Sequence, residues 1–294
     1  MTHDTSLPFD RPSAPRKALP RGACDTHAHV FGPYDHFPLA DPRPYTPASA
    51  PKDHYFAMLD AVGFERGVLV HGGANGWDHR AMLDAIATTP ERLRGIGVMP
   101  ADASSEKLKE LDAGGVRGLR FTEVAGPTAS QSFAGRVGFD ALSELAPRMR
   151  QLGWHAVLWA NTTSIESASD FLRQLGLPIV IDHLGYFDVT KGVDDAAFRS
   201  LLSLVEDGVA WVKLTAFRNS KSPPGYEDVR PFHDAMVRAN PDRLLWGSDW
   251  PFLGMNVNRP DVGELLSLLD EWLNDDDLRQ RVLVRNPAAL YGFN

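Results

Sequence analysis

The feature that most constrains the fold of this chain is a repeated alternation of two kinds of segment. Short apolar runs rich in β-branched residues are each followed by a stretch with helical periodicity. Eight such units, each of roughly 25 to 40 residues, are the pattern of an α/β chain folded as a (β/α)8 TIM barrel. The predicted strands lie within residues 24–31, 67–73, 94–100, 116–123, 155–161, 177–185, 209–215 and 243–251.

An open, doubly wound sheet is the structural alternative to this barrel. It usually carries a Gly-x-Gly-x-x-Gly turn or a phosphate-binding loop after an early strand. The early strands of this chain are followed by neither motif. The barrel is therefore the preferred fold.

The start of the chain differs in composition from the rest. Residues 1–21 are rich in proline and polar residues and predict an irregular N-terminal arm. Residues 22–294 contain all eight units, and we expect them to form one barrel domain. With 43% hydrophobic residues, the chain can bury a large core.

Charge and cysteine content restrict the partners and the compartment. The net charge of −8 disfavours nucleic acid as a partner, since no dense basic cluster offsets it. Cys24 is the single cysteine, so no internal disulfide forms. No secretory signal or long apolar span is visible. We expect a cytoplasmic protein without a membrane partner, and a homo-oligomer remains open.

Polar residues gather where the predicted strands end. The pair His27 and His29 alternates with Thr26 and Ala28, so both imidazoles should lie on one face of the first strand. In a TIM barrel the carboxyl ends of all strands meet at one face, which carries the active site. Further strand ends supply His71, Arg120, Asp182, His183, Lys213 and Asp249, with Arg218 in the following loop.

Four motifs in this order carry a resemblance to a known family. They are CDTHAHVFGP from Cys24, IDHLG from Ile181, LLWGSDWP from Leu244 and the terminal NPAALYGF. The set resembles the amidohydrolase superfamily, in the branch of the pyrone-dicarboxylate and sugar-acid lactonases. The resemblance implies a (β/α)8 barrel that hydrolyses a lactone, and some relatives decarboxylate unsaturated or aromatic acids.

The chemistry of lactone opening assigns roles to these residues. It needs a base for water, a group that stabilises the oxyanion and an acid for the departing alkoxide. Asp249 suits the first and last tasks, and its place between Trp246 and Trp250 is expected to raise its affinity for a proton. The catalytic set is completed by three residues around the carbonyl oxygen: His27, His29 and His183.

Two alternatives remain for the way in which the histidines act. They donate hydrogen bonds directly, or they hold a divalent metal that polarises the carbonyl. Arg120 stands where the resemblance would require lysine for a binuclear site, and His155 lies at the wrong end of its strand for a mononuclear one. The lactonase branch is understood to work without metal. We expect no required cofactor, or else one zinc ion on His27, His29 and Asp249.

The arginines indicate an anionic substrate. Arg120 and Arg218 present planar guanidinium groups that pair well with a carboxylate. Tyr45, His71 and Asn256 are candidates for binding its hydroxyl groups. The preferred function is hydrolysis of a small carboxylated lactone of the sugar-acid, muconate or pyrone type. A metal-dependent decarboxylase, a lactone isomerase and a non-catalytic binding protein are the alternatives, and the sequence does not identify the lactone.

Overall fold

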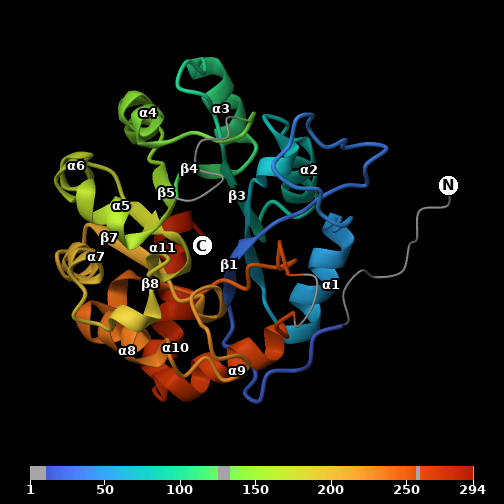
Figure 1. Cartoon of the computed structure of the whole chain (residues 1–294). Helices are drawn as coiled ribbons and strands as arrows, with labels where there is room; N and C mark the ends of the chain where they lie inside the picture. Colours follow the sequence, from blue (N-terminus) through green and yellow to red (C-terminus); the bar gives the residue numbers. More distant parts are fainter. Residues whose placement is uncertain (1–10, 125–132, 256–258, 294) are drawn as a thin grey trace.

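The predicted barrel is confirmed in the computed structural model, which describes residues 11–124, 133–255 and 259–293 (Figure 1). One sheet contains eight parallel strands, each hydrogen-bonded to the next in chain order. The strands are β1 Cys24–Ala28, β2 Arg66–Val70, β3 Leu93–Gly97, β4 Val116–Glu123, β5 His155–Ala160, β6 Ile179–Ile181, β7 Ala210–Lys213 and β8 Leu244–Leu245.

The sheet closes between its first strand and the segment that follows its last. The backbone N–H of Thr26 donates to the carbonyl of Trp246 at 3.0 Å, and that of Asp249 donates to the carbonyl of His27 at 2.8 Å. Ala28 also forms a parallel bridge with Trp250. Because hydrogen bonds then run around the whole ring, the sheet is a barrel rather than an open sheet.

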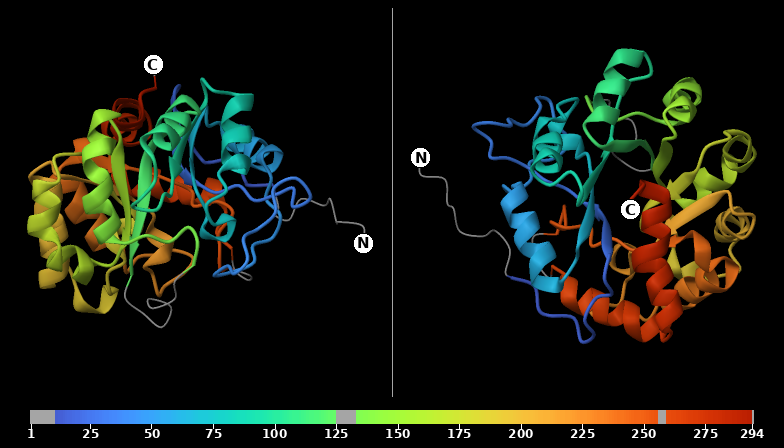
Figure 2. Two further views of the ribbon diagram at one scale, coloured as in Figure 1. Left: turned by 90° about the horizontal axis from the view of Figure 1, so that it is seen from above. Right: turned by 180° about the vertical axis from the view of Figure 1, so that it is seen from behind.

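Helices cover the outside of the barrel, as Figure 2 shows from two further sides. Local signals fix several of their ends: the Ser104 hydroxyl accepts from the N–H of Lys107, and Gly63 ends the first helix at a φ of 92°. The helices are α1 Lys52–Val62, α2 Arg80–Thr88, α3 Ser105–Ala113, α4 Phe139–Gln151, α5 Thr162–Ser167, α6 Ser169–Gln174, α7 Ala196–Glu206, α8 Arg230–Ala239, α9 Val262–Leu273, α10 Asp276–Gln280 and α11 Asn286–Tyr291. Among the described residues, no helix is both long and apolar enough to cross a membrane.

The end of the barrel that faces away from the site is filled by the segment around α11. Tyr291 and Phe293 pack with the apolar residues of the strands, among them Cys24, Val68 and Ile96. His155, at the start of β5, contacts the Tyr291 ring edge-on, with centroids 5.1 Å apart. This confirms that His155 lies at the far end of its strand from the site.

Residues 11–20 contain no helix or strand and run along α9 and α10. The Ser13 hydroxyl donates to Asp261, and Arg279 donates to the carbonyl of Ala18 at 2.8 Å. The division of the chain at residue 21 stays a prediction.

Two of the strands that carry site residues are shorter than the sequence pattern predicts. Strand β6 stops at Ile181 and β8 at Leu245, and the chain then turns sharply. His183 has a φ of 50° and Asp249 a φ of 56°, in the left-handed region that side chains with a Cβ rarely adopt. The polar residues therefore lie in irregular turns above the strands.

The close approach of Gly247 to β1 generates a prediction about stability. A Cβ at this position would lie 2.5 Å from Cβ of His27 and 2.8 Å from its backbone nitrogen. We expect Gly247→Ala to lower the free energy of unfolding by about 1–3 kcal/mol, because backbone atoms must move apart. Chemical denaturation measures the change. The matched control is Gly225→Ala, whose Cβ would meet its nearest neighbour at 3.7 Å; an equal loss in both variants would contradict the prediction.

Candidate active site

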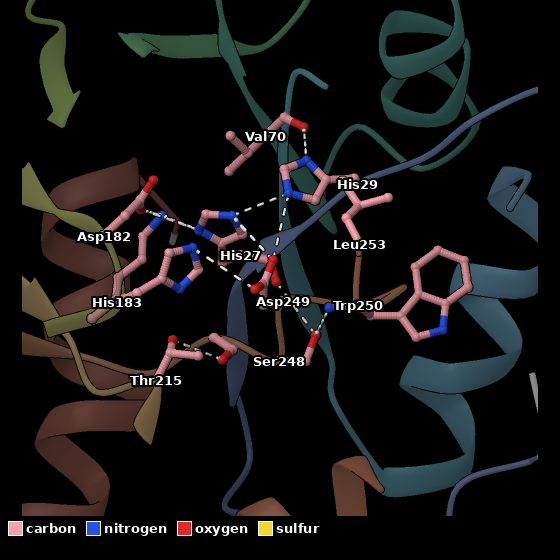
Figure 3. Close-up of polar contacts among 12 residues, drawn as sticks. His27, His29, Val70, Asp182, His183, Thr215, Ser248, Asp249, Trp250 and Leu253 are labelled. Carbon is pink, nitrogen blue, oxygen red and sulfur yellow. Dashed lines mark hydrogen bonds and ion pairs between the residues drawn. The ribbon is translucent and has the colours of Figure 1, made fainter. Parts of the chain in front are cut away.

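His27 and His29 lie at the carboxyl end of β1, and Figure 3 shows both rings directed into one space. The pairing of β1 with β2 is irregular between Asp25 and Ala28. Strict alternation would put Asp25 and His27 on the same face, yet Asp25 contacts Tyr55 of α1 while His27 contacts residues of the barrel interior. The Nε2 atoms of His27 and His29 are 3.3 Å apart.

Asp249 lies opposite this pair and is almost fully buried. Its Oδ1 is 3.6 Å from Nε2 of His27 and 3.5 Å from Nε2 of His29. Its Oδ2 is 3.8 Å from Nε2 of His183, which follows β6. Four residues from three distant parts of the chain thus surround one small volume, as the strand-end argument predicts.

A second buried carboxylate, Asp182, holds His27 from behind. Its Oδ1 is 3.1 Å from Nδ1 of His27 and 3.0 Å from Nζ of Lys213. Its Oδ2 accepts from Nε of Arg120 at 3.0 Å. The Arg120 guanidinium also lies over the ring of Trp159, 5.0 Å from the ring centre. Three partners therefore compensate the charge of one carboxylate that has no exposed surface.

Arg218 holds Asp249 in a comparable way. Its Nε donates to Oδ2 of Asp249, and its Nη1 donates to the carbonyl of Leu253 at 2.9 Å. The side chain of Arg218 keeps 18% of its surface exposed. A group that touches Asp249 and is still partly exposed can contact a bound ligand.

The expected rise in the proton affinity of Asp249 is wrong. Burial does raise the pKa of its carboxyl, but the Arg218 guanidinium and the neighbouring imidazoles outweigh burial and hold this pKa well below its usual range. The carboxyl is therefore ionised at neutral pH. Burial lowers the pKa of His183 to about 4 and that of His27 well below its usual range, and Lys213 adds to the latter shift. Both rings are neutral at neutral pH.

The remaining predicted binding residues have mixed positions. His71 donates from Nε2 to the carbonyl of Gly76 at 2.8 Å and stacks on His79 at 4.3 Å. Tyr45 contacts Phe31 edge-on, and burial raises the pKa of its phenol. The structure brings neither side chain into hydrogen-bond contact with the four central residues. Asn256 lies outside the described residues.

Sequence reasoning missed the residues that support this site. Asp25, fully buried below the histidine pair, accepts from the N–H of Ser248 at 2.8 Å and from its hydroxyl at 2.7 Å. Burial raises the pKa of Asp25 to about 6. Asn219 donates to the carbonyl of His183 at 2.8 Å, and Tyr186 packs edge-on against the His183 ring. An acidic residue two positions before the histidine pair was the available signal for Asp25.

The donor set was tested against a divalent metal. Among the residues that the structure describes, His27, His29 and Asp249 form one group with converging ligand atoms, and His27, Asp182 and His183 form another. In the first group the three atoms are 3.3, 3.5 and 3.6 Å apart. Ligands about 2.1 Å from a tetrahedral zinc ion lie roughly 3.4 Å from one another. His27, His29 and Asp249 therefore fit such an ion.

Comparison with known proteins relates the whole barrel to lactone hydrolases. The chain is 40% identical to 4-sulfomuconolactone hydrolase of Rhizobium radiobacter, covering 94% of this chain and 91% of the relative. It is 37% identical to 2-pyrone-4,6-dicarboxylate hydrolase of Comamonas testosteroni, covering 96% and 94%. A crystal structure from Acinetobacter baumannii with citric acid bound is 27% identical, with a TM-score of 0.79 over 92% of this chain and all of the other.

A more distant amidohydrolase from Burkholderia multivorans, solved with bound zinc, shares the fold at 18% identity and a TM-score of 0.68, covering 94% of this chain and all of the other. The amidohydrolase family model matches residues 24–293, which is the entire barrel. This chain belongs to the amidohydrolase family.

Proposed function

We propose that this protein is a hydrolase that opens a small anionic lactone, with Asp249 as the base that activates water. The observation that carries the proposal is the buried and ionised Asp249, whose two oxygens face the rings of His27, His29 and His183. The names of the similar proteins, a sulfomuconolactone hydrolase and a pyrone-dicarboxylate hydrolase, support the substrate class.

The first step is attack of water on the ring carbonyl. Asp249 accepts a proton from water as the oxygen bonds to the carbonyl carbon, and the carbonyl oxygen becomes an oxyanion. His183 and His27 are the proposed donors to that oxyanion. The Nδ1 of His29 lies 2.7 Å from the carbonyl of Val70 and donates to it. A neutral His29 therefore presents Nε2 as an acceptor, which suits it to orient the water rather than the oxyanion.

The second step breaks the ring. The tetrahedral intermediate collapses, the bond between the carbonyl carbon and the ring oxygen breaks, and protonated Asp249 returns its proton to the departing oxygen. The product is a carboxylate with a free hydroxyl. A divalent ion, if held by His27, His29 and Asp249, would add Lewis-acid polarisation of the carbonyl.

The charges around the site favour an anionic substrate. The two carboxylates Asp182 and Asp249 face three basic side chains, those of Arg120, Lys213 and Arg218. With neutral histidines, these five groups leave one positive charge in excess. Arg218 is the proposed contact for the substrate's carboxylate or sulfonate, because it is the most exposed of the three.

The first test measures ring opening in water enriched in oxygen-18. The panel contains a sulfomuconolactone, a pyrone dicarboxylate, sugar-acid lactones and an uncharged lactone. We expect at least one anionic lactone to be opened with one labelled oxygen in the new carboxylate, and the uncharged lactone to react poorly. An isomer without label would identify a lactone isomerase, and an inert panel would contradict the proposal.

Asp249→Asn keeps the shape of the side chain and removes the base. We expect kcat to fall about 100-fold or more, while KM changes little, because the lost interaction belongs to the transition state. Steady-state kinetics on the best substrate of the panel measures this. Retention of most of kcat would exclude Asp249 as the base.

Removal of Arg218 should change the pH dependence. Arg218 keeps the pKa of the Asp249 carboxyl low against the effect of burial. In Arg218→Met this pKa rises, so Asp249 becomes protonated at a higher pH and the acid limb of kcat/KM moves upward. The matched control is Arg199→Met, which removes an exposed arginine of the outer helix α7. An acid limb that moves equally in both variants would contradict the prediction.

A further inference from the structure

We propose that Lys213 fixes the tautomer of His27, so that Nε2 of this ring carries the hydrogen and donates into the site. Lys213 ends β7 and is fully buried behind His27, where substrate does not reach it. It is therefore a positioning residue. The tautomer does not depend on which reaction is catalysed, whereas its catalytic consequence rests on the lactone hydrolysis proposed above.

The argument begins at His29. Its Nδ1 is 2.7 Å from the carbonyl oxygen of Val70. A carbonyl only accepts hydrogen bonds, so Nδ1 of His29 carries a hydrogen. In the neutral ring the other nitrogen, Nε2, then carries a lone pair and is an acceptor.

The Nε2 of His27 therefore faces two acceptors. One is Nε2 of His29 at 3.3 Å, and the other is Oδ1 of Asp249 at 3.6 Å. A lone pair on Nε2 of His27 would put three acceptors together in a buried space, which is unfavourable without a cation between them. A hydrogen on this nitrogen converts the repulsion into donation.

The far side of the ring completes the arrangement. With hydrogen on Nε2, Nδ1 of His27 is an acceptor, and Nζ of Lys213 lies 3.0 Å from it. Lysine only donates. Oδ1 of Asp182, at 3.1 Å, competes for the same nitrogen by favouring the opposite tautomer. Lys213 also lies 3.0 Å from that oxygen, so the ammonium group can donate to both partners.

This arrangement opposes metal binding. A metal ion on His27 and His29 needs a lone pair on both Nε2 atoms. His27 then has to carry its hydrogen on Nδ1 and donate it to Asp182. The two tautomers exclude each other: one makes His27 a donor to a carbonyl oxygen, and the other makes it a metal ligand. Lys213 favours the first and Asp182 the second.

The direct test is the nitrogen-15 NMR spectrum of protein labelled in its histidine rings, at about pH 8, where ordinary histidines are neutral. Protonated and unprotonated ring nitrogens have well-separated shifts, and the His27 signals are assigned by their loss in His27→Asn. We expect the hydrogen on Nε2 in the wild type. A hydrogen on Nδ1 in the wild type would overturn the proposal, whatever the variants do.

Two variants separate the hydrogen bond from the charge. Lys213→Met removes both and should move the hydrogen of His27 to Nδ1. Lys213→Gln removes the charge but keeps an N–H donor, and should retain the hydrogen on Nε2. If Lys213→Gln behaves like Lys213→Met, the charge rather than the hydrogen bond sets the tautomer and the proposal is wrong.

The second readout is zinc affinity, measured by calorimetric titration of Zn²⁺ into chelator-treated protein. We expect Lys213→Met to bind zinc about tenfold more tightly than the wild type, equivalent to roughly 1.4 kcal/mol. Arg120→Met is the matched control, because it also removes one positive charge from Asp182 but leaves the contact between Lys213 and His27. An equal gain in both variants would overturn the proposal. A tautomer shift as expected, together with an inert lactone panel, would overturn only the proposed function.

Discussion

The buried carboxylate of Asp182 is the charge on which the interior of this barrel depends. It lies at the centre of a contact set with His27, Lys213 and Arg120, and none of its surface is exposed. A carboxylate in such a place is costly unless cations and N–H donors surround it. Those same partners orient His27 and bring a guanidinium to the site. Compensation of one buried charge thus also arranges the groups proposed to bind and polarise the substrate.

Much of the architecture could be predicted from the sequence, because apolar runs and helical periodicity alternate with little ambiguity. The pairing of His27 with Asp249 could also be predicted, since strand ends of a barrel meet at one face. The predicted arrangement of β1 was right in outcome but incomplete in reason. Both histidines enter the site because the strand is irregular after Asp25, which sends that carboxylate outward toward α1 instead.

The electrostatics of the site could not be predicted in the same way. Flanking tryptophans suggested a proton-rich Asp249, and the actual partner, Arg218, lies in a loop whose course the sequence does not give. Lys213 was equally consistent with a contact to Asp182 or Asp249 until the barrel interior was visible. His71 was expected to bind hydroxyl groups, and its hydrogen bond to Gly76 depends on the turn after β2. Directions of side chains beyond a strand end depend on tertiary contacts.

The closure of the barrel between β1 and the segment after β8 determines when the site can form during folding. Asp25 and Ser248, whose hydrogen bonds join the two sides, are 223 positions apart in the chain. Contacts so distant in sequence carry a large loop-closure entropy and form late in most folding reactions. The histidine pair and Asp249 meet only when that ring is complete. Recovery of activity should therefore report the last step of folding, while much of the helical structure is regained earlier.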